Sequence, residues 1–408
     1  MLITLVAACA VLVVQTIYRA RSERLAASWV LAVNEDLPNQ TGRIDLLSAA
    51  YRIDRCFKSM EGPSSNQAGI KLSPNRDDQK VLFITEVRSA IVNAETMKPT
   101  SSEYFCHANL TLNPKKSSPG KHNQSFPIPT HMDWRLVTLV PGMMDIHLPE
   151  GFGLPIRNGT LLDYFTMALN LNASAPKETV RIKTQIAYSG RPNTRALFLR
   201  PLYVYQQFRQ KSGAKVGEET GHVGAACGLS CNRNMVGVNP SQSIDFRVPE
   251  HPGASCCVAN ASDGGIMRQF DADNTIHWMV PPGKHRYTTD VTKELELPFD
   301  TTAHLVTGHL HPMGKALRLV DTDSGAVIFE IRAEDHQGKT GVKSISEIVS
   351  RSGIPLRKDG HYELQADYEN TTSGDVDAMA IMYLYLAESP DKTAMVANRQ
   401  TPDSRPGL

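Results

Sequence analysis

The sequence contains none of the short motifs that mark several common enzyme classes. It has no Gly-x-x-x-x-Gly-Lys-Ser/Thr phosphate loop, no His-Glu-x-x-His pair and no Gly-x-Ser-x-Gly elbow. It has no repeat of fixed period and no long block of one charge sign, and its 43 Lys and Arg residues nearly balance 42 Asp and Glu residues. A nucleic-acid partner requires a basic surface, so no such partner is predicted.

The composition favours an all-β protein. A hydrophobic content of 41 % with 28 Gly and 25 Pro is typical of a turn-rich globular chain rather than a helical bundle or a disordered chain. The 408 residues are enough for two domains with separate apolar cores. We therefore expect two tandem antiparallel jelly-roll-like β-sandwiches, over residues 56–205 and 206–388, with a tail over 389–408.

The N-terminal segment predicts export or membrane attachment. Residues 1–17 are almost wholly apolar, and Arg19, Arg21 and Arg24 follow them, as in a signal peptide or a single membrane anchor over 1–18. The positive charge after the apolar run favours retention of that flank in the cytoplasm, so both interpretations stay open. Residues 19–55 are expected to be a leader or stalk with a short helix, and the protein is expected to be extracytoplasmic.

Cysteines and glycosylation motifs also indicate export. Six cysteines follow the apolar segment, an even number that predicts disulfides in an oxidising compartment. Cys56 and Cys106 both lie in the first predicted domain, so we expect them to pair with each other. The other four cysteines lie in a Gly- and Ser-rich insertion over 209–268, where their spacing fits disulfides better than a zinc ribbon. Seven Asn-x-Ser/Thr motifs begin at Asn39, Asn109, Asn123, Asn158, Asn172, Asn260 and Asn370.

Strand patterns recur on both sides of that insertion. Short apolar runs alternate with turn residues at 81–92, 134–140, 164–173 and 181–208, and again at 275–283, 301–311, 316–333, 361–370 and 377–388. The sequence DTDSG at 321–325 separates two apolar runs and predicts a hairpin turn.

The strand at 301–311 carries a candidate metal site. Alternate side chains of a strand point to one face, so His309 and His311 point the same way. In the strand at 377–388, Met379 and Tyr383 share a face by the same rule. Two imidazoles and a thioether suit copper that changes between Cu(I) and Cu(II), although methionine in a strand is also ordinary core filler.

These segments together resemble the copper type II, ascorbate-dependent monooxygenases, the family of peptidylglycine alpha-hydroxylating monooxygenase and dopamine beta-monooxygenase. The resemblance rests on Pro281-Pro282-Gly283, on HLHPMGKAL at 309–317 and on the later Met-x-x-x-Tyr strand, with a weaker match at 148–156. It implies O2 activation and substrate hydroxylation at a copper held by His309, His311 and Met379. Tyr383 falls where the peptide enzyme contacts its substrate.

The chain departs from the family at the other copper site. Family members hold an electron-storing copper on a His-His pair and a third His in the first domain, but this chain has Cys106-His107 and Asn170 at those positions. His107 is then either a residual ligand or an ordinary polar residue, which leaves one or two coppers open. His131 and His147 are other first-domain histidines, and nothing in their spacing identifies them as replacements.

The substrate-binding positions also differ from the family. Thr307 replaces the arginine that binds the substrate carboxylate in the peptide enzyme, and Ile381 replaces its asparagine partner. We therefore expect a less polar small molecule as substrate, with O2 and ascorbate as co-substrates. A copper-binding or metal-free sandwich without turnover is the alternative. A cupin is a third interpretation, but Lys315 and Ala316 stand where a cupin has a carboxylate ligand.

Overall fold

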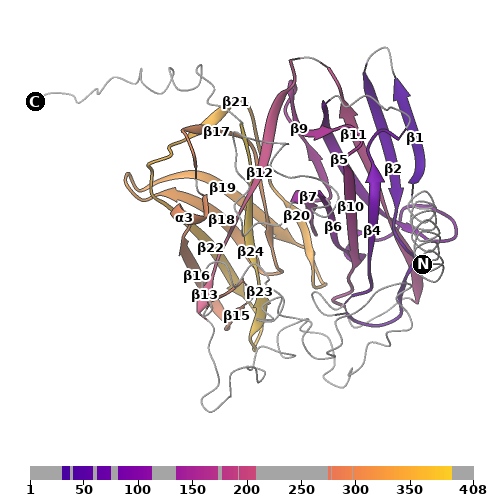
Figure 1. Cartoon of the computed structure of the whole chain (residues 1–408). Coiled ribbons are helices and arrows are strands. Elements are labelled where there is room, and N and C mark those ends of the chain that lie inside the picture. The colour runs from indigo at the N-terminus through magenta and orange to yellow at the C-terminus, as the bar shows by residue number, and fades with distance from the viewer. Residues whose placement is uncertain are drawn as a thin grey trace, which may run out of the picture.

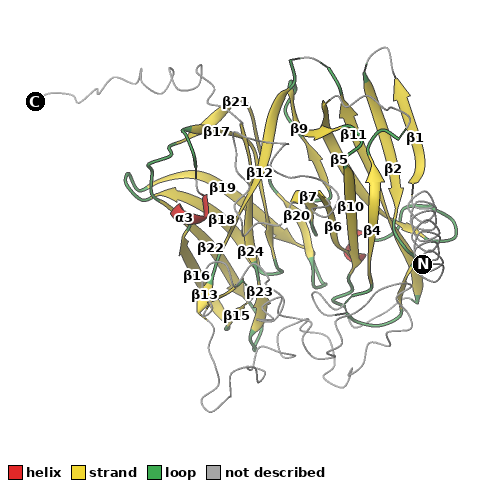
Figure 2. Ribbon diagram, viewed as in Figure 1, coloured by secondary structure: helices red, strands yellow, loops and turns green. Residues whose placement is uncertain are grey.

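The computed structural model describes residues 30–36, 40–57, 62–74, 81–112, 135–172, 177–191, 193–207, 274–276, 278–295 and 297–387. These residues form two antiparallel β-sandwiches that lie side by side (Figures 1 and 2). The all-β prediction is therefore confirmed. Within the described residues, no helix has the length and hydropathy of a membrane span. The N-terminal apolar segment, the insertion at 209–268 and the tail after 388 lie outside the described residues.

The first sandwich has two sheets. One contains β1 (Val30–Asp36), β2 (Thr41–Leu47), β3 (Tyr51–Ile53), β5 (Val81–Asn93), β8 (Asp145–His147), β9 (Phe152–Arg157) and β11 (Glu178–Ser189). The other contains β4 (Ser64–Lys71), β6 (Phe105–Leu112), β7 (Arg135–Leu139) and β10 (Leu161–Ala168), preceded at β6 by the short 3-10 turn η1 (Ser102–Tyr104).

The second sandwich is built in the same way. One sheet contains β12 (Arg195–Tyr203), β17 (Thr301–Leu310), β21 (Ile348–Leu356) and β24 (Ala380–Ala387). The other contains β16 (Gly283–Asp290), β18 (Gly314–Asp321), β19 (Ala326–Asp335), β20 (Val342–Ile345) and β22 (Tyr362–Asn370). Smaller elements complete it: β13 (Gln206–Gln207), β14 (Asn274–Thr275), β15 (Trp278–Val280), β23 (Val376–Ala378) and α3 (Thr292–Leu295).

Both sandwiches have the strand order of a jelly roll. In the second, the sheet orders are β12-β24-β17-β21 and β16-β22-β18-β19, so the first of eight strands pairs with the last and the second with the seventh. In the first, the corresponding orders are β2-β11-β5-β9 and β4-β10-β6-β7. Strands such as β22 alternate buried and half-buried residues along their length, which is why each sheet buries one face in a core.

One sheet runs through both sandwiches. β9 pairs in parallel with β12 through Phe152–Arg195 and Gly153–Ala196, which makes an 11-stranded sheet. Gly151 precedes β9 with a φ of 86°, and its carbonyl accepts a 2.8 Å hydrogen bond from the Arg195 backbone. A residue with a side chain rarely adopts that φ. The pairing fixes the two sandwiches to each other.

Two predicted boundaries are wrong. Residues 30–55 were expected to be a stalk with a helix, but β1, β2 and β3 are strands of the first sandwich, and β2 pairs with β11 over seven residues. β12 was expected in the first domain, but it pairs with β24 and belongs to the second. The boundary therefore lies between β11 and β12. Strand periodicity identifies a strand but not the sheet that receives it.

Two local predictions have clear outcomes. The DTDSG turn is confirmed, since it joins β18 to β19 with Gly325 at a φ of 72° and its backbone N–H donating to the Asp321 carbonyl. Three of the glycosylation motifs begin at buried residues, Asn109, Asn158 and Asn370. The Nδ2 of Asn370 donates to the carbonyls of Val280 and Gly374. A glycan on that atom conflicts with this folded arrangement.

A buried carboxyl group lies beside β12. Glu294 of α3 is 3 % exposed. Its Oε1 accepts hydrogen bonds from the Tyr203 backbone (3.0 Å) and the Tyr205 hydroxyl (3.2 Å). Burial raises the pKa of Glu294 well above its ordinary value, and the opposing hydrogen bonds and the positive Arg200 offset this only in part.

This raised pKa makes stability depend on pH. Between the ordinary value of 4.5 and the raised value, the folded chain binds more protons than the unfolded chain, so the free energy of unfolding falls as pH rises, by at most about 1.4 kcal/mol per pH unit. Glu294→Gln keeps an acceptor for Tyr203 but removes this contribution. Chemical unfolding from about pH 5 to about pH 8 should show the wild type losing stability relative to Glu294→Gln. Parallel curves for the two proteins would contradict the assignment.

Candidate metal centre

His309, near the end of β17, and His311, just after it, point out of the second core. Gly308, the residue before His309, faces that core, because a side chain at Gly308 would meet Leu317 of β18 at 3.2 Å. His309 and His311 therefore point to the opposite face, towards the first sandwich. Their ring centroids are 5.1 Å apart, and the two residues are 3 % and 6 % exposed. This is the arrangement expected from the His-x-His spacing.

Met379 lies beside this pair in the backbone register. His309 pairs with Ile381, and the backbone N–H of His311 donates to the Met379 carbonyl at 3.2 Å. Residues directly opposite each other on antiparallel strands share a face, with Cβ atoms about 5 Å apart. Met379 is buried but is not one of the residues that line the neighbouring pocket. Its role as a third ligand stays a prediction.

Tyr383 and Thr307 form the next pair along the same two strands. Tyr383 is 2 % exposed and Thr307 is fully buried, with its hydroxyl donating to the Ser346 carbonyl at 3.3 Å. Neither residue lines the pocket. A substrate contact at Tyr383 therefore stays a prediction.

The Cys106-His107 pair lies at a β-bulge between β6 and β10. Met167 pairs with His107 and Ala168 pairs with Phe105, so Cys106 is the extra residue of the bulge. The Cys106 Sγ lies 2.9 Å from the Nδ1 of His107. Neighbouring residues of a regular strand point to opposite faces, whereas a bulge re-aims a side chain. Both side chains consequently face the same pocket.

The pocket lies between the sandwiches. His107 from β6 and His309 from β17 have ring centroids 5.8 Å apart. Both line the pocket, together with Cys106, His311 and Asp377. The pair of sandwiches is held here by reciprocal hydrogen bonds between Asn172 and Thr340, at 3.0 and 3.1 Å. The two predicted copper regions thus meet in one place.

Asp377 orients His311. The Nδ1 of His311 lies 2.7 Å from the Asp377 Oδ2, and both side chains are less than 10 % exposed. A carboxylate on one ring nitrogen fixes the tautomer and directs the other nitrogen to a metal. A contact of this kind would direct the Nε2 of His311 away from Asp377.

Apolar side chains line most of the remaining pocket. They include Pro141, Leu169, Leu171, Pro312, Met313, Val342 and Val376. Its cavity volume is about 60 Å³, room for a few waters or a small ligand group.

Polar groups lie at the wall formed by the β19–β20 hairpin. Burial favours a higher pKa for Glu103, but its hydrogen bonds to Lys339 and Ser101 outweigh burial and lower the pKa. Burial, with the nearby Lys339 charge, lowers the pKa of His336. The pocket thus has imidazole and apolar surfaces, and of its two carboxylates Glu103 pairs with Lys339 while Asp377 lies against His311.

The predicted Cys56–Cys106 disulfide is wrong. Cys56 is disulfide-bonded, whereas Cys106 keeps its thiol and is 2 % exposed. Asn170, at the position of the missing third imidazole, caps backbone instead, since its Nδ2 donates to the Arg55 carbonyl at 2.9 Å. The residue that sequence reasoning undervalued is therefore Cys106, because the signal that brings it to the pocket is the bulge.

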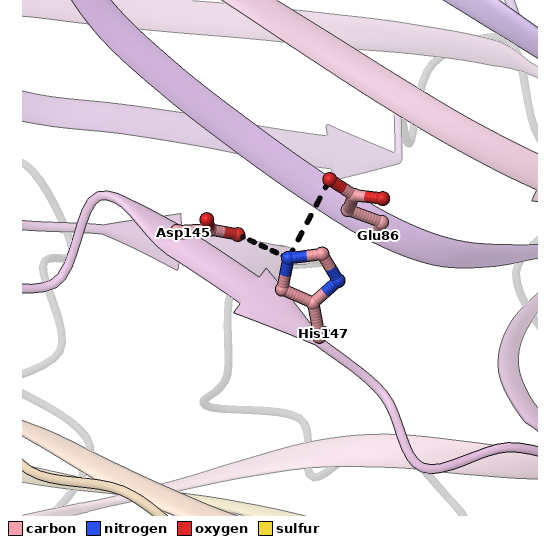
Figure 3. A group of neighbouring side chains, drawn as sticks. All are labelled: Glu86, Asp145 and His147. Atoms are coloured by element: carbon pink, nitrogen blue, oxygen red, sulfur yellow. Dashed lines mark ion pairs between the residues drawn. The ribbon is translucent and has the colours of Figure 1, made fainter.

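His147 belongs to a different group, on β5 and β8. Its Nε2 lies 3.0 Å from Asp145 and 3.5 Å from Glu86 (Figure 3). These three side chains can bring their ligand atoms within 4.8 Å of one another. Arg88 already pairs with this group, with its Nε 2.8 Å from Asp145 and its Nη2 3.0 Å from the His147 ring. The group is best explained as a surface ion-pair network. His131 lies outside the described residues.

The donor atoms in the pocket fit copper. Imidazole and thiol groups are soft or borderline ligands. The buried pair His309 and His311, with a carboxylate behind His311, supplies two directed nitrogen donors. Hard cations such as Mg²⁺ instead prefer oxygen ligands.

Comparison with known proteins gives no family. No family model and no curated protein matches the chain. Similar solved structures include the major capsid protein P2 from bacteriophage PM2, with 8 % identity over 85 % of this chain and 99 % of that chain, at a TM-score of 0.28. PNGase F, a glycosylasparaginase from Flavobacterium meningosepticum, has 8 % identity over 85 % of this chain and 97 % of that chain, at a TM-score of 0.33. These scores carry no argument about function.

The Asp377–His311 contact can be tested by metal affinity. Asp377→Asn keeps the size of the side chain but removes its charge, so copper affinity at His311 should fall about 10- to 100-fold. Asp323→Asn is the matched control, because Asp323 contacts the Nδ1 of the exposed His361 at 2.8 Å. Competition titration with a chelator measures both variants. Equal affinity in Asp377→Asn and wild type would rule out this role.

Proposed function

We propose that this protein is a copper-dependent monooxygenase-like enzyme that hydroxylates a C–H bond of a small, lipophilic substrate with O2 and an ascorbate-type reductant. His309, His311 and Met379 would hold the copper, which supplies O2 activation when bound. The observation that supports this most is the buried His309–His311 pair on the wall of a pocket, with Met379 opposite His311 in the register.

The chain's own residues have separate tasks in this proposal. Asp377 holds the His311 ring, so that one nitrogen faces the metal. The apolar wall, including Leu169, Pro312 and Val376, excludes water and receives the substrate. The apolar lining of the pocket favours a lipophilic substrate, the class that Thr307 and Ile381 also indicate. Neither of those two residues lines the pocket.

The overall reaction balances with one reductant molecule. A substrate R–H, O2 and ascorbate give R–OH, water and dehydroascorbate: one oxygen atom enters the C–H bond, the other leaves as water, and ascorbate supplies two electrons and two protons. An extracytoplasmic location is part of the proposal. The disulfide at Cys56 supports it, because structural disulfides are typical of oxidising compartments.

A second candidate is a copper-binding sandwich without turnover. It is favoured by Asn170, which caps backbone where the family has an imidazole, and by the absence of Met379 and Tyr383 from the residues that line the pocket. Such a protein would bind copper at His309 and His311 and consume no O2.

Oxygen uptake separates these candidates. The copper-loaded full chain with ascorbate should consume O2, and the double variant His309→Ala, His311→Ala should lose about 100-fold or more of this rate, since a bound metal contributes several kcal/mol to such reactions. The double variant should also bind one copper fewer than the wild type. His361→Ala, which removes an exposed imidazole outside the pocket, is the matched control. Uptake that is the same in the double variant and the wild type would refute the enzyme.

A further inference from the structure

We propose that Met313 determines substrate size in the pocket, and that it limits the substrate group that enters to a short aliphatic chain. Met313 follows His311 by two residues and lines the same pocket. The role of the pocket as a substrate site rests on the proposed function. The size limit is a property of the folded chain, so it can be tested without copper and without turnover.

The backbone conformation of Met313 is the first argument. Residues 311–314 form a β-turn, in which the backbone N–H of Gly314 donates to the His311 carbonyl at 3.1 Å. Met313 is the third residue of this turn and has a φ of 73°. With Pro312 in second place, this is the pattern of a type II turn, whose third residue is ordinarily glycine or asparagine. A long side chain at that φ strains the backbone.

Neighbouring strands hold the turn in this conformation. The Met313 N–H donates to the Oδ2 of Asp335 in β19 at 3.0 Å, and the Met313 carbonyl accepts from the N–H of Glu369 in β22 at 2.9 Å. Strained residues persist where the surrounding structure fixes them, and they cluster at functional sites. These two bonds use only the backbone of Met313, so glycine would make them equally well. The reason for a methionine here therefore lies in what its side chain contacts.

The Met313 side chain occupies one wall of a small cavity. It is half-buried, and it packs against the second core on one side and lines the pocket on the other. The cavity volume is about 60 Å³, whereas an apolar cavity of about 150 Å³ binds benzene. The pocket is thus too small for an aromatic ring while the Met313 side chain is in place. Its apolar lining and its volume together suit a short aliphatic chain.

The chain offers a matched control for the strain. Met97 is also a methionine in the left-handed region, with a φ of 56°, and it does not line the pocket. It lies in the turn between β5 and η1, where its N–H donates to the Asn93 carbonyl at 3.0 Å. Glycine at either methionine relieves backbone strain, but only the change at Met313 enlarges the pocket. The two effects can therefore be measured separately.

NMR titration of the copper-free full chain with two apolar probes, xenon and benzene, tests the size limit. Wild type should bind xenon, the smaller probe, and exclude benzene. Met313→Ala and Met313→Gly should bind benzene at least tenfold more tightly than wild type. Met313→Leu, which conserves volume, and Met97→Gly should both exclude benzene as wild type does. Equal benzene affinity in wild type and Met313→Ala would overturn the proposal.

Chemical unfolding of the same variants tests the strain. Met313→Gly should unfold at a higher denaturant concentration than Met313→Ala, because both lose the thioether and only glycine readily adopts a positive φ. Met97→Gly should likewise be more stable than Met97→Ala. A midpoint for Met313→Gly at or below that of Met313→Ala would show that the turn is unstrained and would overturn the argument for Met313.

The size limit and the proposed function can fail independently. Benzene binding gained only in the shortened Met313 variants, together with no O2 uptake by the copper-loaded wild type, would support the size limit of a binding pocket and refute the enzyme. O2 uptake that is lost in the His309→Ala, His311→Ala variant, together with equal benzene affinity in wild type and Met313→Ala, would support the enzyme and overturn the size limit.

Discussion

The parallel pairing of β9 with β12 is the constraint on which the rest of the molecule depends. It makes one sheet from strands of both sandwiches, so that their relative orientation is set by backbone hydrogen bonds rather than by side-chain packing alone. The Asn172–Thr340 bonds and the Glu103–Lys339 ion pair then hold the β19–β20 hairpin against the first sandwich. Between these two connections, His107 and His309 lie against each other across the pocket, with ring centroids 5.8 Å apart.

The pocket between the sandwiches concentrates groups that are costly to bury unless they have partners. Asp377 is paired with His311, the Cys106 thiol contacts His107, and burial lowers the pKa of His336. The other lining residues are mostly apolar, with a few hydroxyl groups such as Ser102 and Thr340. The proposed copper and lipophilic substrate rest on these imidazole, thiol and apolar groups, which suit a soft ion better than a hard cation.

The two halves of the pocket reach the same result by different backbone geometry. At the end of β17, strand alternation places His309 and His311 on one face, and Gly308, the residue before His309, fits against Leu317 in the core. On β6 the neighbours Cys106 and His107 share a face only because the strand is bulged opposite Met167. Cys106 keeps its thiol in the pocket, whereas Cys56 is disulfide-bonded.

Local periodicity in the sequence was sufficient for strands such as β5, β11, β17 and β24, for the DTDSG hairpin and for the common face of His309 and His311, because the alternation of a regular strand depends only on neighbouring residues. Tertiary structure decided the rest. The allocation of β12 to the second sandwich, the inclusion of β1 to β3 in the first, the Cys106 bulge and the His107–His309 contact all depend on which distant strands pair. Sheet order and register are non-local, since they are set by packing between segments far apart in the chain.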